Sequence, residues 1–195
     1  MKTYGLTGGI GMGKSTAGRL LHDRGLPVVD TDTLARRIVE PGEPAHREIR
    51  DAFGPDVLAP DNRLRREVLA RIVFADPAAR RNLEAITHPR IRELWRRELE
   101  NWRKDGRKVA VVVIPLLFET GAERELDATI CVACSPATRR RRVEERHWTP
   151  EQLEQRIAAQ WPVEKKMAAS NFVVWSEGSL EVFGAQLDRI LQHDR

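Results

Sequence analysis

The chain has 195 residues, which is enough for one domain with an inserted lobe and for a sizeable buried core. A hydrophobic content of 41% and a net charge of only +4 exclude the disordered, collagen-like and disulfide-scaffold classes. No apolar run is long enough to cross a membrane, and the chain begins with a strand-like pattern instead of a signal peptide, so we expect a cytoplasmic protein with no membrane partner.

Short apolar stretches alternate with longer helical ones, a pattern typical of a parallel sheet covered by helices. The pattern predicts strands at residues 2–7, 27–29, 109–114 and 128–134, with a shorter fifth strand at 172–175. Residues 109–114 are apolar without interruption, which indicates a central strand. We therefore expect an α/β fold on a five-stranded parallel sheet.

The segment between the second and third strands, about residues 33–107, is polar, helical and too long for a simple crossover. We expect an inserted helical lobe there. Within it, one helix presents an apolar face that belongs in a core, formed by Ile91, Leu94, Trp95, Leu99 and Trp102. Residues 135–169 contain Pro150 and Pro162 and predict two or three short helices, and residues 179–191 predict a final amphipathic helix.

Cys131 and Cys134 have the C-x-x-C spacing of redox and metal sites. They lie in an apolar strand pattern, and no second pair of cysteines or histidines stands at metal-ligand spacing in the sequence. We therefore interpret both as free thiols of a buried strand.

A glycine-rich motif directly follows the first predicted strand. Gly8 to Ser15 reads GGIGMGKS, fits the pattern G-x-x-x-x-G-K-[ST], and precedes a helical pattern over residues 15–24. In this motif backbone N–H groups surround phosphate oxygens, Lys14 bridges the β and γ phosphates, and the Ser15 hydroxyl coordinates magnesium. A chance glycine-rich turn would have to match the glycines, the Lys-Ser pair and both flanking elements together. The motif predicts a site for a purine nucleoside triphosphate with Mg²⁺.

The second predicted strand ends in two carboxylates, Asp30 and Asp32. Ligands of open α/β sheets bind at the carboxyl ends of the strands, and strand residues two apart point to the same side. One carboxylate can accept the proton of an attacking hydroxyl, while the other holds magnesium-bound water or orients a helix. The alternative is that these residues only cap a helix starting at Thr33. The first interpretation predicts transfer of a γ-phosphoryl group to an acceptor hydroxyl.

Motifs along nearly the whole chain share one family resemblance. They are residues 6–15, 29–32 and 35–42, Thr87-His88-Pro89 with Ile91, residues 115–119, Arg142 with Arg146, Arg156 with Gln160, Glu164-Lys165, and residues 178–180. In these motifs the chain resembles the dephospho-coenzyme A kinases. The resemblance implies ATP-dependent phosphorylation of the ribose 3′-hydroxyl of dephospho-coenzyme A, the final step of coenzyme A biosynthesis.

The resemblance also implies an architecture, that of a P-loop kinase similar to the nucleoside monophosphate kinases. A single kinase domain would comprise a nucleotide-binding core, a helical acceptor-binding lobe and a helical lid. The core would take about residues 1–32, 107–134 and 170–195, the lobe about 33–106 and the lid about 135–169.

Carried over residue by residue, the resemblance implies a catalytic set of Asp32, Lys14 and Arg142, in which Asp32 is the base toward the 3′-hydroxyl. The implied ATP contacts are Gly8, Gly11, Met12, Gly13, Lys14, Ser15, Thr16, Arg142 and Arg146. The implied contacts to dephospho-coenzyme A are Thr7, Asp32, Arg36, His88, Leu116 and Glu119. Magnesium would be held by Ser15, with Asp30 or Asp32 acting through water. Arg142 and Arg146 would lie in the lid and close over the phosphates.

Three of these assignments have structural alternatives. Without the resemblance, residues 139–142 are a run of arginines typical of a solvated helix face. His88 precedes Pro89 and can begin a helix as its cap. Glu119 can equally be a surface loop residue.

The chain departs from the family pattern at several positions. Val113 stands where an aspartate is usual, so a second carboxylate for magnesium would have to come from Asp30, Asp32 or Glu119. Met12 replaces the usual serine and leaves the backbone N–H donors intact. Ser170-Asn171 and Ser176 stand where Ala-Asp and Asn are common, so the contacts to adenine can differ.

Other functions fit parts of the pattern. Shikimate-like kinases also combine a phosphate loop with D-x-D, but they usually show a glycine triplet where this chain has IPLLF at residues 114–118. A nucleic-acid-binding ATPase is disfavoured, because aromatic residues are few and the arginines scatter among acids. A non-catalytic nucleotide-binding relative is supported only by Val113. We expect a monomer or weak oligomer that binds dephospho-coenzyme A and no nucleic acid.

Overall fold

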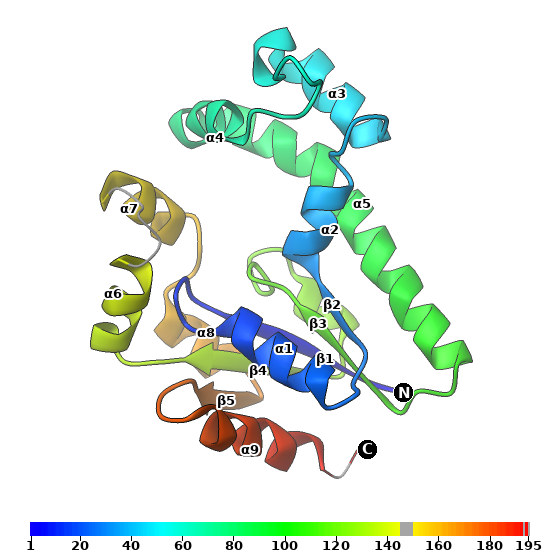
Figure 1. Ribbon diagram of the computed structural model, residues 1–195, viewed down its shortest axis with the longest axis vertical. Helices are drawn as coiled ribbons and strands as arrows, with labels where there is room; N and C mark the ends of the chain where they lie inside the picture. Colours follow the sequence, from blue (N-terminus) through cyan, green and yellow to red (C-terminus); the bar gives the residue numbers. More distant parts are fainter. Residues whose placement is uncertain (145–149, 193, 195) are drawn as a thin grey trace. The chain divides into compact units, whose positions relative to one another are not determined.

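The computed structural model describes residues 1–144, 150–192 and 194 (Figure 1). The chain forms two compact units. The first unit comprises Met1–Asp30 and Leu99–Arg195, and the second comprises Thr31–Glu98. The second unit is therefore an insertion in the sequence of the first.

The first unit contains a sheet of five parallel strands, which confirms the predicted α/β fold. The strands are β1 (Lys2–Gly8), β2 (Val28–Asp30), β3 (Val109–Val113), β4 (Ala128–Ala133) and β5 (Phe172–Trp175). They lie in the order β2-β3-β1-β4-β5. β3 is an interior strand, as its apolar sequence indicates, but the middle position belongs to β1.

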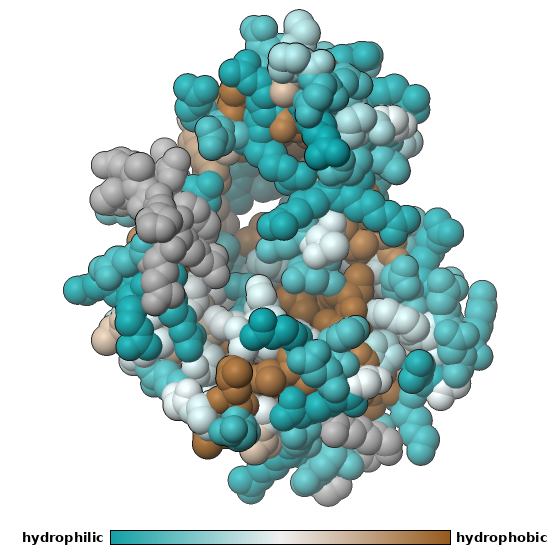
Figure 2. All heavy atoms as spheres, in the orientation of Figure 1, coloured by the Kyte–Doolittle hydropathy of each residue, from teal (hydrophilic) through white to brown (hydrophobic). Residues whose placement is uncertain are grey.

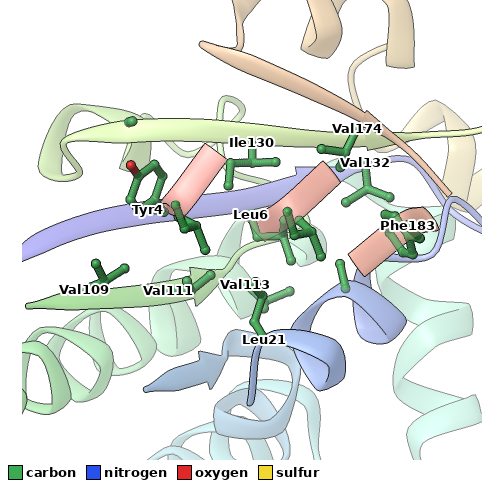
Figure 3. Close-up of a cluster of buried hydrophobic side chains, with 14 residues drawn as sticks. Tyr4, Leu6, Leu21, Val109, Val111, Val113, Ile130, Val132, Val174 and Phe183 are labelled. Atoms are coloured by element: carbon green, nitrogen blue, oxygen red, sulfur yellow. The ribbon is translucent and has the colours of Figure 1, made fainter. Parts of the chain in front are cut away.

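One core lies between the sheet and two helices, α1 (Lys14–Asp23) and α9 (Leu180–Leu191) (Figure 3). Alternate strand residues point into this core: Tyr4, Leu6, Val109, Val111, Val113, Ile130 and Val132. The residues between them, such as Thr7 and Cys131, point to the opposite face, where α8 (Val163–Ala169) contacts β1 and β4. The interior strands β3, β1 and β4 are mostly apolar because both faces of the sheet are covered there.

Between β4 and β5, the described residues form three short helices, as the prolines of this segment predict. They are α6 (Pro136–Glu144), α7 (Pro150–Ala158) and α8. Cys131 and Cys134 are free and buried, as expected, but only Cys131 lies in β4, and Cys134 directly follows the strand. Burial raises the pKa of the Cys131 thiol to about 11 and also raises the pKa of Cys134.

The second unit is helical and has a core of its own. Its elements are α2 (Thr31–Arg37), α3 (Pro44–Phe53), the 3-10 turn η1 (Pro55–Val57), α4 (Arg66–Ala75) and the first part of α5 (Pro77–Lys104). Its buried apolar side chains are Ile38, Val39, Ala45, Ile49, Val57, Leu69 and Ile86. The face of this unit that is visible in Figure 2 is largely hydrophilic. In α5, Trp95 and Leu99 are buried, as the predicted apolar face requires.

None of the helices in the described part of the chain is long and apolar enough to cross a membrane.

Candidate functional site

The loop between β1 and α1 uses glycine where no other residue fits. Gly8 has φ 147°, and a Cβ there would lie 2.3 Å from the carbonyl oxygen of Val132. Gly13 has φ 93°, and a Cβ there would lie 2.9 Å from the Cβ of Ser176. Close backbone approach therefore requires both glycines. The loop lies between a strand and a helix, where the motif predicts it.

Lys14, Ser15 and Thr16 form the first turn of α1. The Lys14 ammonium lies across the loop and donates hydrogen bonds to the carbonyls of Gly8 at 2.9 Å and Gly9 at 2.8 Å. The Ser15 side chain is exposed. Gly13 supplies no side-chain cap to α1. The first N–H groups of this helix and two of its polar side chains are therefore suited to an anion.

Met12 contributes its backbone to the loop and its side chain to the interior. The side chain is buried, with its sulfur 3.5 Å from the Cys134 sulfur. Its N–H donates to the carbonyl of Gly9 at 3.3 Å, and its own carbonyl accepts a hydrogen bond from the Ser176 hydroxyl at 2.7 Å. Met12 thus contributes a buried apolar side chain, while its backbone groups take part in the hydrogen bonds of the loop.

Arg142 lies in α6 and reaches the phosphate loop. Its Nη1 donates to the Ser176 hydroxyl at 2.7 Å and to the carbonyl of Gly11 at 3.4 Å, and its Nη2 donates to the carbonyl of Ser176 at 2.6 Å. Arg142 therefore does not simply belong to a solvated arginine face, because its guanidinium is hydrogen-bonded to the loop and to Ser176. Arg146, predicted beside it, lies outside the described residues.

The N-terminal end of α6 is also tied to the segment after β5. The Glu177 carboxylate accepts hydrogen bonds from the Ser135 hydroxyl and from the Ser135 N–H, the latter at 3.0 Å. These hydrogen bonds, chiefly that of the hydroxyl, lower the pKa of Glu177, and the Arg142 charge contributes in the same direction. The contact between Ser135 and Glu177 therefore ties the start of α6, the helix that contains Arg142, to the segment after β5.

The loop after β3 contains a buried ion pair. Lys166 of α8 is 0% exposed, and its ammonium donates to the Pro115 carbonyl at 2.6 Å and lies 2.9 Å from Oε1 of Glu119. Oε1 also accepts a hydrogen bond from the Trp161 N–H at 2.7 Å. Oε2 of Glu119 is buried and has no hydrogen-bond partner among the residues that the structure describes. The alternative of Glu119 as a surface loop residue is therefore wrong, because the carboxylate is held inside the unit.

The same loop packs against the chain that leads from α7 into α8. The rings of Phe118 and Trp161 stack with centroids 5.8 Å apart, and the Lys165 ammonium lies 3.5 Å from the Trp161 ring centroid. Leu116 is half-buried in this loop. Thr7, at the end of β1, donates its hydroxyl to the Pro115 carbonyl at 3.2 Å.

The two aspartates after the second strand occupy different elements. Asp30 is the last residue of β2, whereas Asp32 is an exposed residue in the first turn of α2. The helix begins at Thr31, two residues earlier than expected, so Asp32 does not cap a helix at Thr33. The expectation that both carboxylates share a strand face is also wrong. Arg36 lies one turn after Asp32 in the same helix, so the two side chains share a helix face.

His88 lies in the middle of α5 and does not begin a helix, because α5 continues through Pro89. The helix tolerates this proline because the carbonyl that loses its N–H partner belongs to Ala85, which is exposed like Pro89. Burial, more than the nearby arginines, lowers the pKa of His88. The imidazole is therefore a neutral hydrogen-bonding group at neutral pH.

Val113 fills the position of the missing aspartate with an apolar side chain. It is 2% exposed and packs in the core with Leu6 and Leu21 (Figure 3). A Cβ on Gly18 of α1 would lie 3.3 Å from its Cγ2. The end of β3 therefore offers no carboxylate to a metal ion.

The predicted site residues divide between the two units. The first unit holds the phosphate loop, Arg142, Thr7, Leu116 and Glu119, and the second holds Asp32, Arg36 and His88. Two further residues of the first unit have polar contacts at this site that the sequence does not predict. Ser176 is marked in the sequence only as a departure from the family, and Lys166 looks no different from its neighbour Lys165.

Comparison with known proteins identifies the family. The family model for dephospho-CoA kinase matches residues 3–181. A dephospho-CoA kinase from Anaeromyxobacter dehalogenans is 46% identical over 192 residues, covering 98% of this chain and 91% of that protein. Another from Geobacter sulfurreducens is 44% identical over 191 residues, covering 97% of each chain.

Two solved structures also match this chain over nearly its full length. The crystal structure of TT1252 from Thermus thermophilus matches with a TM-score of 0.84 and 38% identity, covering 98% of this chain and 97% of that one. A dephospho-CoA kinase from Campylobacter jejuni matches with a TM-score of 0.71 and 25% identity, covering 99% and 97%. With its phosphate loop, its five-stranded parallel sheet and these full-length matches, the chain belongs to the dephospho-CoA kinase family.

Proposed function

We propose that the protein transfers the γ-phosphoryl group of ATP to the ribose 3′-hydroxyl of dephospho-coenzyme A and so produces coenzyme A and ADP. The observation that carries this proposal is a complete phosphate loop in a chain that matches dephospho-CoA kinases over nearly its full length. The reaction uses ATP, which supports a cytoplasmic location. We expect a monomer or weak oligomer that needs no nucleic acid.

The triphosphate binds at the phosphate loop. The N–H groups of the first turn of α1 point to the β phosphate, and the Lys14 ammonium exchanges its two carbonyl acceptors for phosphate oxygens. Arg142 adds a second cation at the same loop, where charge-assisted hydrogen bonds stabilise the transferring group. Arg146 of the proposed lid is assigned to the phosphates by family resemblance alone.

The acceptor oxygen attacks the γ phosphorus, the bond from this phosphorus to the bridging oxygen of ADP breaks, and the hydroxyl proton passes to a carboxylate. Asp32 is the proposed base. Two features support it: it follows the carboxyl end of β2 by two residues, and its side chain is exposed on α2. Arg36, His88, Thr7, Leu116 and Glu119 are proposed as contacts to the acceptor.

The donor set fits a magnesium ion that arrives with the nucleotide. The described residues contain no group of three or more His, Cys, Asp or Glu side chains able to hold a metal, and Val113 supplies no oxygen. Ser15 offers an exposed hydroxyl beside the loop, and Asp30 or Asp32 can act through water. Bound in this way, magnesium would neutralise phosphate charge, and the protein would supply few of its ligands.

A direct assay tests the proposal. ADP release from MgATP is measured with and without dephospho-coenzyme A, and mass spectrometry determines whether the acceptor has gained one phosphoryl group. We expect ADP release that depends on the acceptor. ATP binding without turnover would support a non-catalytic relative, and turnover with shikimate instead would support another small-molecule kinase. Hydrolysis without any acceptor would indicate an ATPase.

Two variants test the assigned roles. Lys14→Ala should lower kcat by at least about 10²-fold, with exposed Lys104→Ala as its control. Asp32→Asn should lower kcat by about 10²- to 10⁴-fold while ATP affinity stays within about twofold, with exposed Asp23→Asn as its control. A fully active Asp32→Asn enzyme would refute the base assignment.

A further inference from the structure

Ser176, the first residue after β5, joins the phosphate loop to Arg142. Its side chain is only 5% exposed. Its hydroxyl donates to the Met12 carbonyl at 2.7 Å and accepts a hydrogen bond from Nη1 of Arg142, also at 2.7 Å. One buried hydroxyl therefore contacts both the loop and the arginine that reaches it.

The backbone of Ser176 makes this contact rigid. Its N–H donates to the Ala133 carbonyl at 2.9 Å, which continues the pairing of β4 with β5. Its carbonyl accepts from Nη2 of Arg142 at 2.6 Å. Two oxygens of a single residue, itself fixed to the sheet, thus hold the end of the Arg142 guanidinium like a bidentate acceptor.

This arrangement leaves one edge of the guanidinium for a ligand. The hydroxyl and carbonyl oxygens of Ser176 take the edge formed by Nη1 and Nη2, and Nε of Arg142 donates to no residue in the described part of the chain. The edge formed by Nε and Nη2 is therefore able to bind two oxygens of a phosphate.

The same contacts place this cation directly against the phosphate loop. A Cβ on Gly13 would lie 3.4 Å from Nη1 of Arg142, and a Cβ on Gly11 would lie 2.9 Å from Cγ2 of Val143. Arg142 and Lys14 are two positive charges held at one loop, beside the N-terminus of α1. Such a cluster favours a polyanion.

We propose that Ser176 is a positioning residue for the nucleotide: it orients Arg142 before ATP binds, so that the arginine meets the triphosphate in its bound geometry. A long arginine side chain otherwise loses rotamer freedom on binding, and prior orientation removes that penalty. The inference rests on the proposed role of Arg142 toward ATP. It assigns a role to the position where the family commonly has asparagine.

The test uses the full-length chain and does not depend on the acceptor. Calorimetry gives the Kd for MgATP of wild type, Ser176→Ala, Arg142→Lys and the double variant. Ser176→Ala keeps both backbone contacts and loses only the hydroxyl. Ser179→Ala is the matched control, because the Ser179 hydroxyl accepts from the Val182 N–H at the start of α9 and, among the described residues, contacts neither the phosphate loop nor Arg142. Thermal melting of each variant monitors folding.

We expect Ser176→Ala to raise the Kd for MgATP about tenfold and Ser179→Ala to leave it unchanged. In the Arg142→Lys background, Ser176→Ala should change the Kd less than about twofold, because no guanidinium remains to be oriented. Steady-state kinetics add a second readout, in which the KM for dephospho-coenzyme A stays within about twofold of wild type while kcat/KM for ATP falls about tenfold.

Three results would overturn the inference. An unchanged Kd in Ser176→Ala, with Arg142→Lys impaired, would show that the arginine needs no orientation and would leave the proposed function intact. Equal losses from Ser176→Ala in both backgrounds would mean that the hydroxyl acts on the loop through the Met12 carbonyl alone. If Arg142→Lys binds MgATP like wild type, the role of Arg142 fails first and the inference fails with it.

Discussion

Replacing Lys166 with methionine should destabilise the protein far more than the same change at Lys165. The Lys166 ammonium is 0% exposed and satisfies Oε1 of Glu119 at 2.9 Å and the Pro115 carbonyl at 2.6 Å. Lys166→Met keeps the length of the side chain but leaves the Glu119 carboxylate buried without a counter-ion. Breaking a buried pair in this way costs about 3–5 kcal/mol. The exposed Lys165 makes a single cation–π contact, worth about 0.5–1 kcal/mol.

Thermal and urea unfolding of the two variants measure this difference. At about 2–4 °C per kcal/mol for a domain of this size, Lys166→Met should lower Tm by about 6–20 °C and Lys165→Met by at most about 4 °C. Combining Lys166→Met with Glu119→Gln should restore at least about half of the loss, because no net charge remains buried and the amide oxygen still accepts from the Trp161 N–H. Equal Tm values for Lys166→Met and Lys165→Met would refute the buried-pair argument.

Three further predictions concern the loop, the thiols and the start of α6. Gly8→Ala should lower the free energy of unfolding by at least about 2 kcal/mol more than Gly25→Ala does. Both glycines have positive φ, but only at Gly8 would a new Cβ meet a backbone atom, 2.3 Å away. Urea unfolding of the two variants measures this difference. Because its pKa is raised to about 11, Cys131 should resist a thiol reagent at pH 8 in the native protein and react after denaturation. The stability that its buried thiol contributes should fall as pH rises from about 9 through 11. A fast reaction in the native protein would contradict its burial. The pKa of Glu177 is lowered from 4.5 in the folded protein. The stability that its carboxylate contributes is therefore present above pH 4.5 and lost as pH falls through the lowered pKa. The urea midpoints of wild type and Glu177→Gln should differ at pH 7 and converge in acid.

The sequence determines much of this protein because its strongest signals are local. Buried parallel strands must be apolar on both faces, so all five strands can be found to within one or two residues. The phosphate loop needs glycine where the backbone approaches β4, and this requirement is visible in the motif itself. Pro150 and Pro162 likewise indicate boundaries between the short helices after β4: α7 begins at Pro150, and Pro162 directly precedes α8. Proline fits the start of a helix because the first N–H groups of a helix have no partner within it.

Local signals fail at two helix boundaries. Pro89 suggests a helix boundary, yet α5 continues through it at a position where both Pro89 and Ala85 are exposed. Asp32 reads as the continuation of a strand, but a helix already begins at Thr31. Neither outcome has a signature in the neighbouring residues of the sequence.

The sequence by itself therefore determined the sheet, the phosphate loop and the family. Only the tertiary structure decided which polar side chains support that loop. Lys165 and Lys166 are adjacent and identical in type, but one lies over an aromatic ring and the other is buried against Glu119. Ser176 stands 164 residues from Met12, yet its hydroxyl bonds to the Met12 carbonyl and to Arg142. Such contacts depend on how the strands and helices pack together, and the local pattern of a sequence carries no information about partners so distant.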